Sequence, residues 1–194
     1  DVRCGGIGVQ LSGRKLRAAQ IVAMQTEGMG TFESAREFCK VMCTDPIFPD
    51  YPVYGSNNWY YAYGDSSEEE ILQDTDYIVE LTKGVDNPPY MVIDDCWQEH
   101  HRLDEYNGGP WKKGNIKFPD MGALAKKLEE KGVRPGIWVR FLLNEEETIP
   151  QEWRLSHNDC LDPSHPGVLS YIQEDVERIC NWGYTLIKHD FTTF

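Results

Sequence analysis

Four short apolar runs recur along residues 50–194, and each is followed by polar side chains. The runs are Val53–Gly55, Tyr90–Ile93, Gly136–Val139 and Tyr184–Ile187. Their apolar residues are continuous rather than alternating with polar ones, which is typical of strands covered on both faces in a parallel sheet. We therefore expect four buried parallel strands in this part of the chain.

Amphipathic stretches separate these runs and carry signals for helix ends. Ser67 with Glu70 forms a capping-box pattern before the first stretch, Leu124 and Leu128 mark the second, and Pro166 suits the first turn of a third that ends at Gly183. Alternating strands and helices predict an α/β fold with helices outside a parallel sheet. A doubly wound sheet has the same alternation, but residues 56–59 lack the glycine-rich phosphate turn expected after its first strand. We favour the first half of a (β/α)8 TIM-type barrel, as four βα units.

The residues before position 50 have a different pattern. Apolar side chains at Ile7, Val9, Leu11 and Leu16 are spaced without a helical period and are broken by glycines, which predicts antiparallel strands over residues 2–27. Thr31 can then cap a helix over residues 32–43. The predicted organisation is a remnant of a β-sandwich domain at 1–30, whose closing strands precede the barrel, a connecting helix and linker at 31–49, and the barrel half at 50–194.

The composition of the chain excludes some classes of binding partner. The formal charge of −13 disfavours binding to a phosphate backbone, so nucleic acid is excluded as a partner. No apolar run is long enough to cross a bilayer, and no membrane partner is expected. Aromatic residues make up 12% of the chain, and such rings pack on the apolar faces of sugars. A homo-oligomer stays open. So does the compartment, which is secreted or periplasmic if a signal was removed upstream and cytoplasmic otherwise.

The chemistry-bearing side chains follow the four strands. Because the carboxyl ends of barrel strands converge on one mouth, we expect these residues to gather around a single pocket. The set is Asn57, Asn58, Trp59, Asp94, Asp95, Trp97, Arg140, Lys188 and Asp190. It suits a polyhydroxylated substrate, with carboxylates accepting from hydroxyl groups, Lys188 donating to one, and Trp59 or Trp97 covering a ring face. Asp190 can act as a nucleophile at an anomeric carbon, with Lys188 keeping it ionised.

These pieces occur together in one known family. The chain resembles the retaining, melibiase-like α-galactosidases of glycoside hydrolase families 27 and 36, and its layout is closest to family 36. The resemblance rests on Gly55–Trp59, Ile93–Trp97, Phe118-Pro119, Gly136–Trp138, Leu161–Pro166 and Trp182–Tyr184 leading to Lys188–Asp190. It covers residues 50–194. His189 and the pair Asn57-Asn58 depart from the family's pattern, and the identity of the sugar is the implied property that depends most on these positions.

The resemblance implies roles for the site residues. Asp190 would be the catalytic nucleophile, and Lys188 with the pair Asp94 and Asp95 would bind the sugar that is cleaved off. The implied reaction is hydrolysis of a terminal α-linked galactose from an oligosaccharide or glycoside, without a cofactor. Retaining hydrolysis needs a second carboxyl about 5 Å from the first. In the family this acid/base lies on a later strand, so we expect it to be missing here and residues 1–194 to be inactive alone.

Two other functions stay open. A barrel aldolase would use Lys188 to form a Schiff base, although it has no need for the paired Asp94 and Asp95. A non-catalytic carbohydrate-binding relative would keep the pocket and lack the acid/base. His100-His101 beside the carboxylates invites a metal site, but adjacent histidines do not easily turn both rings to one ion, and we predict no metal.

Overall fold

The computed structural model describes residues 12–15, 17, 19–155 and 159–191. The chain forms two compact units, Asp1–Phe48 and Pro49–Phe194, and each is described by itself. Within the described residues, no helix is both long and apolar enough to span a membrane.

Among its described residues, the first unit contains one helix, α1 (Thr31–Met42). Its N-cap is Gly30, whose backbone N–H donates to the Glu33 carboxylate at 3.2 Å, so the prediction that Thr31 caps the helix is wrong by one residue. The described part of residues 12–30 contains no strand. The remaining positions expected to form sandwich strands lie outside the described residues. The sandwich therefore stays a prediction.

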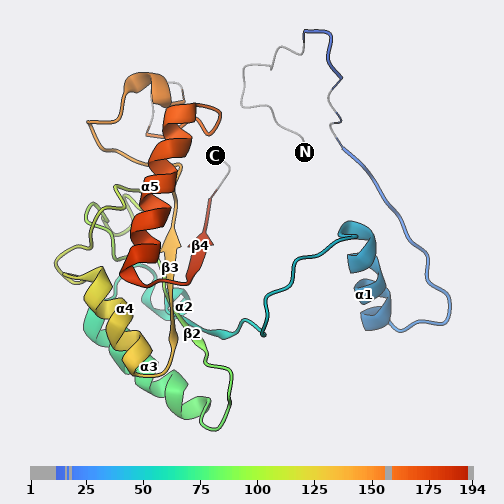
Figure 1. Ribbon diagram of the computed structural model, residues 1–194, viewed down its shortest axis with the longest axis horizontal. Helices are drawn as coiled ribbons and strands as arrows, with labels where there is room; N and C mark the ends of the chain where they lie inside the picture. Colours follow the sequence, from blue (N-terminus) through green and yellow to red (C-terminus); the bar gives the residue numbers. More distant parts are fainter. Residues whose placement is uncertain (1–11, 16, 18, 156–158, 192–194) are drawn as a thin grey trace. The chain divides into compact units, whose positions relative to one another are not determined.

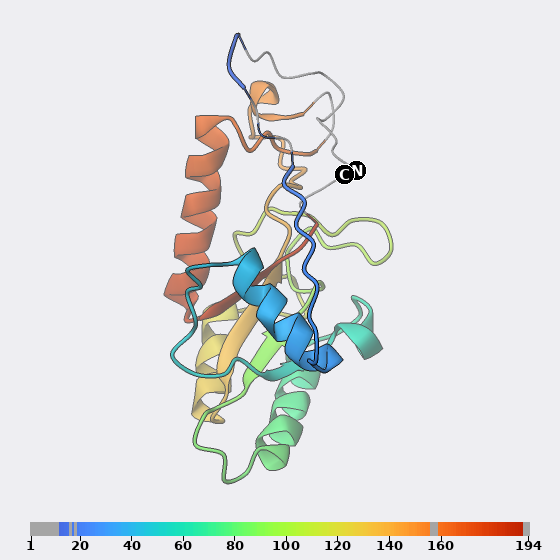
Figure 2. The same ribbon diagram turned by 90° about the vertical axis from the view of Figure 1, so that its right-hand side faces the viewer.

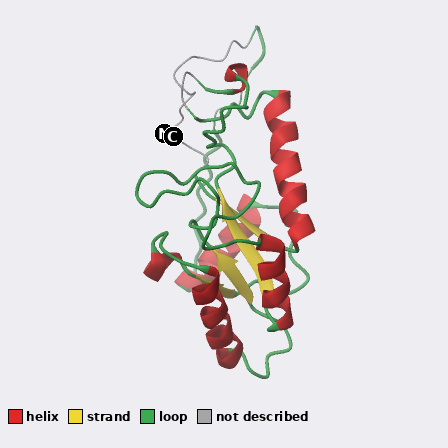
Figure 3. Ribbon diagram, turned by 90° about the vertical axis from the view of Figure 1, so that its left-hand side faces the viewer, coloured by secondary structure: helices red, strands yellow, loops and turns green. Residues whose placement is uncertain are grey.

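The second unit is built on a four-stranded parallel sheet. Its strands are β1 (Gly55–Asn57), β2 (Tyr90–Ile93), β3 (Arg134–Val139) and β4 (Leu186–His189), and they lie side by side in chain order. Helices α3 (Glu68–Leu81), α4 (Met121–Glu130) and α5 (Pro166–Trp182) connect them and cover the same face of the sheet (Figures 1 and 3). Two short helical turns, α2 (Trp59–Ala62) and η1 (Gln151–Trp153), lie in the connections. This is the predicted arrangement of four βα units.

The helix ends follow the signals in the sequence. Ser67 Oγ accepts the Glu70 backbone N–H at 3.4 Å before α3, and Asp120 caps α4 in the same way at 2.9 Å. Pro166 is the first residue of α5, and Gly183 ends it with a φ of 107°, which favours glycine. Because these ends are fixed locally, the helices could be predicted closely.

The first strand begins two residues later than predicted. The expected run was Val53–Gly55, whereas pairing with β2 starts at Gly55, opposite Tyr90. The backbones approach so closely there that a Cβ on Gly55 would lie 1.9 Å from the Tyr90 carbonyl oxygen. This close approach needs glycine, and it starts the pairing at Gly55.

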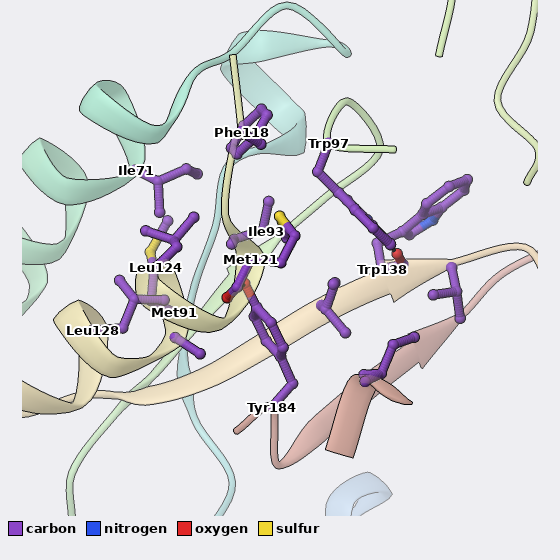
Figure 4. Close-up of a cluster of buried hydrophobic side chains, with 14 of the residues drawn as sticks. Ile71, Met91, Ile93, Trp97, Phe118, Met121, Leu124, Leu128, Trp138 and Tyr184 are labelled. Carbon is purple, nitrogen blue, oxygen red and sulfur yellow. Dashed lines mark hydrogen bonds between the residues drawn. The ribbon is translucent and has the colours of Figure 1, made fainter. Parts of the chain in front are cut away.

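The core lies between the sheet and the helices. Met91 and Ile93 of β2 point to Leu124 and Leu128 of α4 and to Ile71 of α3, and all five side chains are fully buried (Figure 4). The opposite sheet face bears the residues between these positions in each strand, because side chains alternate along a strand. The loops that follow the strands gather at one end of the sheet (Figure 2).

Candidate active site

Strand register brings the predicted residues onto one face of the sheet. Trp138 of β3 is the register partner of Lys188 of β4. Trp138 lies between Ile137 and Val139, and Lys188 follows Ile187, which packs against the core. Asp190 follows two residues after Lys188 and continues the same alternation. The face opposite the helices therefore carries Trp138, Lys188 and Asp190 at its carboxyl end.

Asp94 is the centre of a hydrogen-bonded cluster. Its Oδ2 accepts from Lys188 Nζ and from Asn57 Nδ2, both at 2.6 Å, and its Oδ1 accepts from the Asp95 backbone N–H at 2.9 Å. The Asp94 side chain is 3% exposed and that of Lys188 is 38% exposed. The Asp94 backbone N–H donates to Asn58 Oδ1 at 2.8 Å. Asp94, which follows β2, is thus held by residues of β1 and β4, and the ammonium group beside it still reaches solvent.

Asp190 is held by two N–H donors. The indole Nε1 of Trp138 donates to Oδ2 at 3.1 Å, and the Phe191 backbone N–H donates to Oδ1 at 2.9 Å. Partial burial acts to raise the pKa of Asp190. The two hydrogen bonds and the nearby cations Lys188 and Arg140 outweigh burial and hold the pKa below its ordinary value. Asp190 is therefore an oriented, ionised carboxylate.

The pKa of Asp95 is displaced in the opposite direction to that of Asp190. Burial raises its pKa to about 6, and the neighbouring Asp94 adds to this, while the hydrogen bond from Gln98 Nε2 to Oδ1 at 2.8 Å opposes it. The pKa values of Asp95 and Asp190 are thus displaced in opposite directions within one site, which is common in functional sites.

These groups line a cavity of about 230 Å³ at the carboxyl end of the sheet. Its walls combine three carboxyl groups, one ammonium group, one amide and several aromatic rings. The lining residues are Trp59, Tyr60, Asp94, Asp95, Asn107, Trp138, Lys188, Asp190 and Phe191. A small cavity with convergent donors and acceptors beside aromatic rings suits a polyhydroxylated ring.

Five of the eight predicted site residues line this cavity: Trp59, Asp94, Asp95, Lys188 and Asp190. The structure does not bring the other three to its wall. Asn58 is buried and holds the Asp94 backbone, and Arg140 donates to Asn107 Oδ1 at 2.6 Å. Trp97 is fully buried and donates from its indole to the Trp138 carbonyl at 2.8 Å, beside Trp138 in Figure 4. The expectation that Trp97 covers a sugar face is therefore corrected, because its ring packs in the core.

Three residues that line the cavity or orient its carboxylates were not assigned substrate roles from the sequence. Asn57 belonged to the strand-end set, and its amide orients Asp94. Trp138 was interpreted as a residue of the barrel core, and its position one residue before the end of the third run was the available signal. Asn107 lies in the long loop after β2, where no periodicity indicates its position.

The two adjacent histidines lie beside carboxylates. His100 Nδ1 lies 3.1 Å from Glu145, whereas His101 Nε2 lies 3.9 Å from Asp95, so the two rings face different carboxylates. Across the described ranges, no group of three His, Cys, Asp or Glu side chains could hold a metal ion.

No family model matches the chain. It is 26% identical over 140 residues to an α-galactosidase from Oryza sativa subsp. japonica, which covers 72% of this chain and 29% of that protein. It is 29% identical over 143 residues to α-galactosidase mel1 from Schizosaccharomyces pombe, which covers 72% and 28%. The chain thus spans less than a third of the length of these two curated relatives.

Solved structures give the same resemblance. The GH36 α-galactosidase AgaA from Geobacillus stearothermophilus matches with a TM-score of 0.59 and 27% identity, over 73% of this chain and 21% of that one. TtGalA, an α-galactosidase from Thermus thermophilus in complex with stachyose, matches with a TM-score of 0.59 and 22% identity, over 75% and 33%. The chain resembles the melibiase-like α-galactosidases of family 36, and its sheet and helices match part of their α/β barrel.

Proposed function

We propose that this chain is part of the catalytic barrel of a glycoside hydrolase that removes terminal α-linked galactose with retention of configuration. The observation that carries the proposal is Asp190, an ionised carboxylate fixed by two N–H donors in a polar cavity beside Lys188 and Asp94. The resemblance to α-galactosidases supports the choice of sugar.

Most of the cavity residues bind the sugar, and Asp190 reacts with it. Asp94 and Lys188 hold each other in fixed positions, so their remaining lone pairs and N–H groups can bind sugar hydroxyls without first becoming ordered. Trp59 lines the same cavity and offers an aromatic ring to the apolar face of the sugar. Asp95 accepts a further hydroxyl hydrogen bond.

In the first step an Asp190 carboxylate oxygen attacks the anomeric carbon. The bond from that carbon to the leaving oxygen breaks, its electron pair stays on the leaving oxygen, and an acid carboxyl protonates it. Water then attacks the anomeric carbon of the glycosyl ester and gives a proton to the carboxylate that had protonated the leaving oxygen, and Asp190 leaves as a carboxylate. Two inversions at one carbon retain its configuration. We propose that the acid carboxyl is supplied by a part of the protein outside residues 1–194, so these residues alone do not hydrolyse oligosaccharides.

The two alternatives are weaker. A Schiff-base aldolase needs the Lys188 amine to attack a carbonyl carbon, but Lys188 Nζ is engaged at 2.6 Å with Asp94. A binding protein without catalysis does not require an oriented, ionised Asp190, although it would bind the same sugars.

Kinetics of the full-length protein test the proposal. Asp190→Asn keeps the size of the side chain and removes its charge, and it should lower kcat on an activated aryl α-galactoside by about 10³-fold or more, as for loss of a catalytic nucleophile. Asp86→Asn is the matched control, because Asp86 is exposed and precedes β2 at the opposite end of the strands. Wild-type turnover by Asp190→Asn would refute the nucleophile assignment. Galactoside binding without any turnover by the wild type would favour the binding protein.

A further inference from the structure

Arg140 lies behind the wall of the catalytic cavity and not in it. It follows β3 directly, is half-buried and does not line the cavity. Its guanidinium group instead contacts Asn107 and Phe191, which both line the cavity. An effect of Arg140 on a bound substrate is therefore indirect and depends on these two neighbours.

The first contact fixes the amide group of Asn107. Arg140 Nη1 donates to Asn107 Oδ1 at 2.6 Å. Because a guanidinium group can only donate hydrogen bonds, the amide oxygen must face Arg140, and the NH2 group is left to donate elsewhere. Asp95 is the acceptor: burial raises the pKa of its carboxyl, and a hydrogen bond from the Asn107 side chain opposes that rise. The amide thus forms a bridge from the cation to the carboxylate.

The second contact bears on the backbone of Phe191. Phe191 has a φ of 49°, in the left-handed region that a bulky side chain rarely adopts. In this conformation its backbone N–H donates to Asp190 Oδ1 at 2.9 Å. The guanidinium carbon of Arg140 lies 4.7 Å from the centre of the Phe191 ring, within the range of a cation–π contact. A strained backbone persists only where its surroundings hold it, and the stacked guanidinium is one group that does so.

The two contacts together need the shape of arginine. A planar guanidinium group can donate to Asn107 in its plane while its face covers the Phe191 ring, whereas the ammonium group of a lysine has no such face. Smaller than the effect of burial, the positive charge of Arg140 also acts to lower the pKa values of both Asp190 and Asp95. Arg140 is thus linked by contact and by charge to two carboxyl groups of the site.

Other charged and titratable groups surround this set and do not change in the variants proposed below. They are Lys188 beside Asp190, Asp94 and His101 beside Asp95, and Tyr106 and Cys160 beside Arg140. A shift in the pH dependence of a variant can therefore be assigned to the loss of the Arg140 charge.

We propose that Arg140 is a positioning residue, which holds Asp190 through Phe191 and Asp95 through Asn107. The inference rests on the proposed function, and it adds a residue that acts on the reaction without touching the substrate. One side chain outside the cavity then places both the carboxylate that reacts with the sugar and a carboxyl group that binds it.

Two substitutions in the full-length protein test this role, with an aryl α-galactoside as substrate. Arg140→Met removes the charge and both contacts. Its kcat should fall by about 10²-fold, as for a misplaced reacting group, and the acid limb of its kcat/KM profile should move up by about half a pH unit or more. Arg140→Lys keeps the charge, so the limb should stay within about 0.2 pH unit while kcat falls by roughly tenfold. Arg36→Met, at an exposed position on α1, is the matched control.

Substitutions at Phe191 keep the inference testable if Arg140→Met does not fold. Glycine adopts a positive φ without the strain that a Cβ brings, so Phe191→Gly should leave the backbone N–H directed at Asp190. Phe191→Ala loses the ring and keeps the strain. We therefore expect a higher kcat for Phe191→Gly than for Phe191→Ala. The reverse order would mean that Phe191 serves only packing and chain stiffness, and it would overturn the inference.

The kinetic outcomes separate this inference from the proposed function. If folded Arg140→Met keeps the wild-type kcat, or loses activity without any movement of the acid limb, the positioning role is wrong. If the wild type does not hydrolyse the aryl galactoside, the proposed function fails instead, and crystal structures of the full-length wild type and Arg140→Met decide the positioning role. Displacement of Asn107 and Phe191 in the variant would support that role, and unchanged positions would overturn it.

Discussion

Asp95 provides a quantitative test of the electrostatics of the site. Asp95 is 5% exposed, and burial raises its pKa from 3.8 to about 6. The folded protein therefore binds this proton more tightly than the unfolded chain does. The resulting stabilisation is fully present below pH 3.8 and is lost as the pH rises through about 6. The displacement is about two pKa units at about 1.36 kcal/mol each, which gives roughly 3 kcal/mol.

Asp95→Asn removes the titrating group and keeps an oxygen that can accept from Gln98. Relative to wild type, the variant should gain roughly 3 kcal/mol of unfolding free energy between about pH 4 and about pH 7. The measurement is urea unfolding followed by tryptophan fluorescence across that range. Asp104→Asn removes an exposed carboxyl from the loop that follows Asp95, and it controls for the loss of one negative charge. A difference between Asp95→Asn and wild type that does not change with pH would refute this reasoning.

Three further substitutions test individual contacts. Lys188→Met leaves the buried Asp94 carboxylate without its cation, and urea unfolding should show a loss of about 3 kcal/mol, the low end for a buried pair because Lys188 is 38% exposed. Trp138→Phe removes one donor to Asp190, so the acid limb of the kcat/KM profile should move up by about one pH unit, and an unmoved limb would contradict this role. Gly136→Ala would put a Cβ 2.8 Å from the Val92 side chain of β2, and urea unfolding should show a loss of about 1–3 kcal/mol in the free energy of unfolding. An unchanged urea midpoint would mean that β2 and β3 can shift apart to make room at no cost in stability.

Local patterns were sufficient to predict most of the barrel half. Ser67, Pro166 and Gly183 act through hydrogen bonds or backbone angles within one helical turn, so their effects can be predicted from neighbouring residues. The start of β1 depends instead on how closely Gly55 approaches Tyr90, which lies 35 positions later. Such contacts between distant residues are not encoded in local spacing.

The sequence predicted those site residues whose side-chain direction is set by the two-residue period of a strand. Asp94, Lys188 and Asp190 follow the period of two along parallel strands, and all three line the cavity. Asp94 lies one residue past the end of β2 and continues its period, whereas Trp97 lies four residues past it, where the period no longer fixes the direction of a side chain, and the Trp97 ring packs in the core. Asn107 reaches the cavity from a long loop whose path depends on contacts such as that with Arg140.

The central claim is that Asp190 forms a covalent bond with the sugar. It can be measured by mass spectrometry after incubation with a fluorinated α-galactosyl fluoride, whose leaving group needs little protonation and whose glycosyl ester is hydrolysed slowly. The account predicts that one fluorogalactosyl group is added to the peptide that contains Asp190, and that Asp190→Asn is not labelled. Labelling of another carboxylate, or turnover of the fluoride without any covalent adduct, would contradict it.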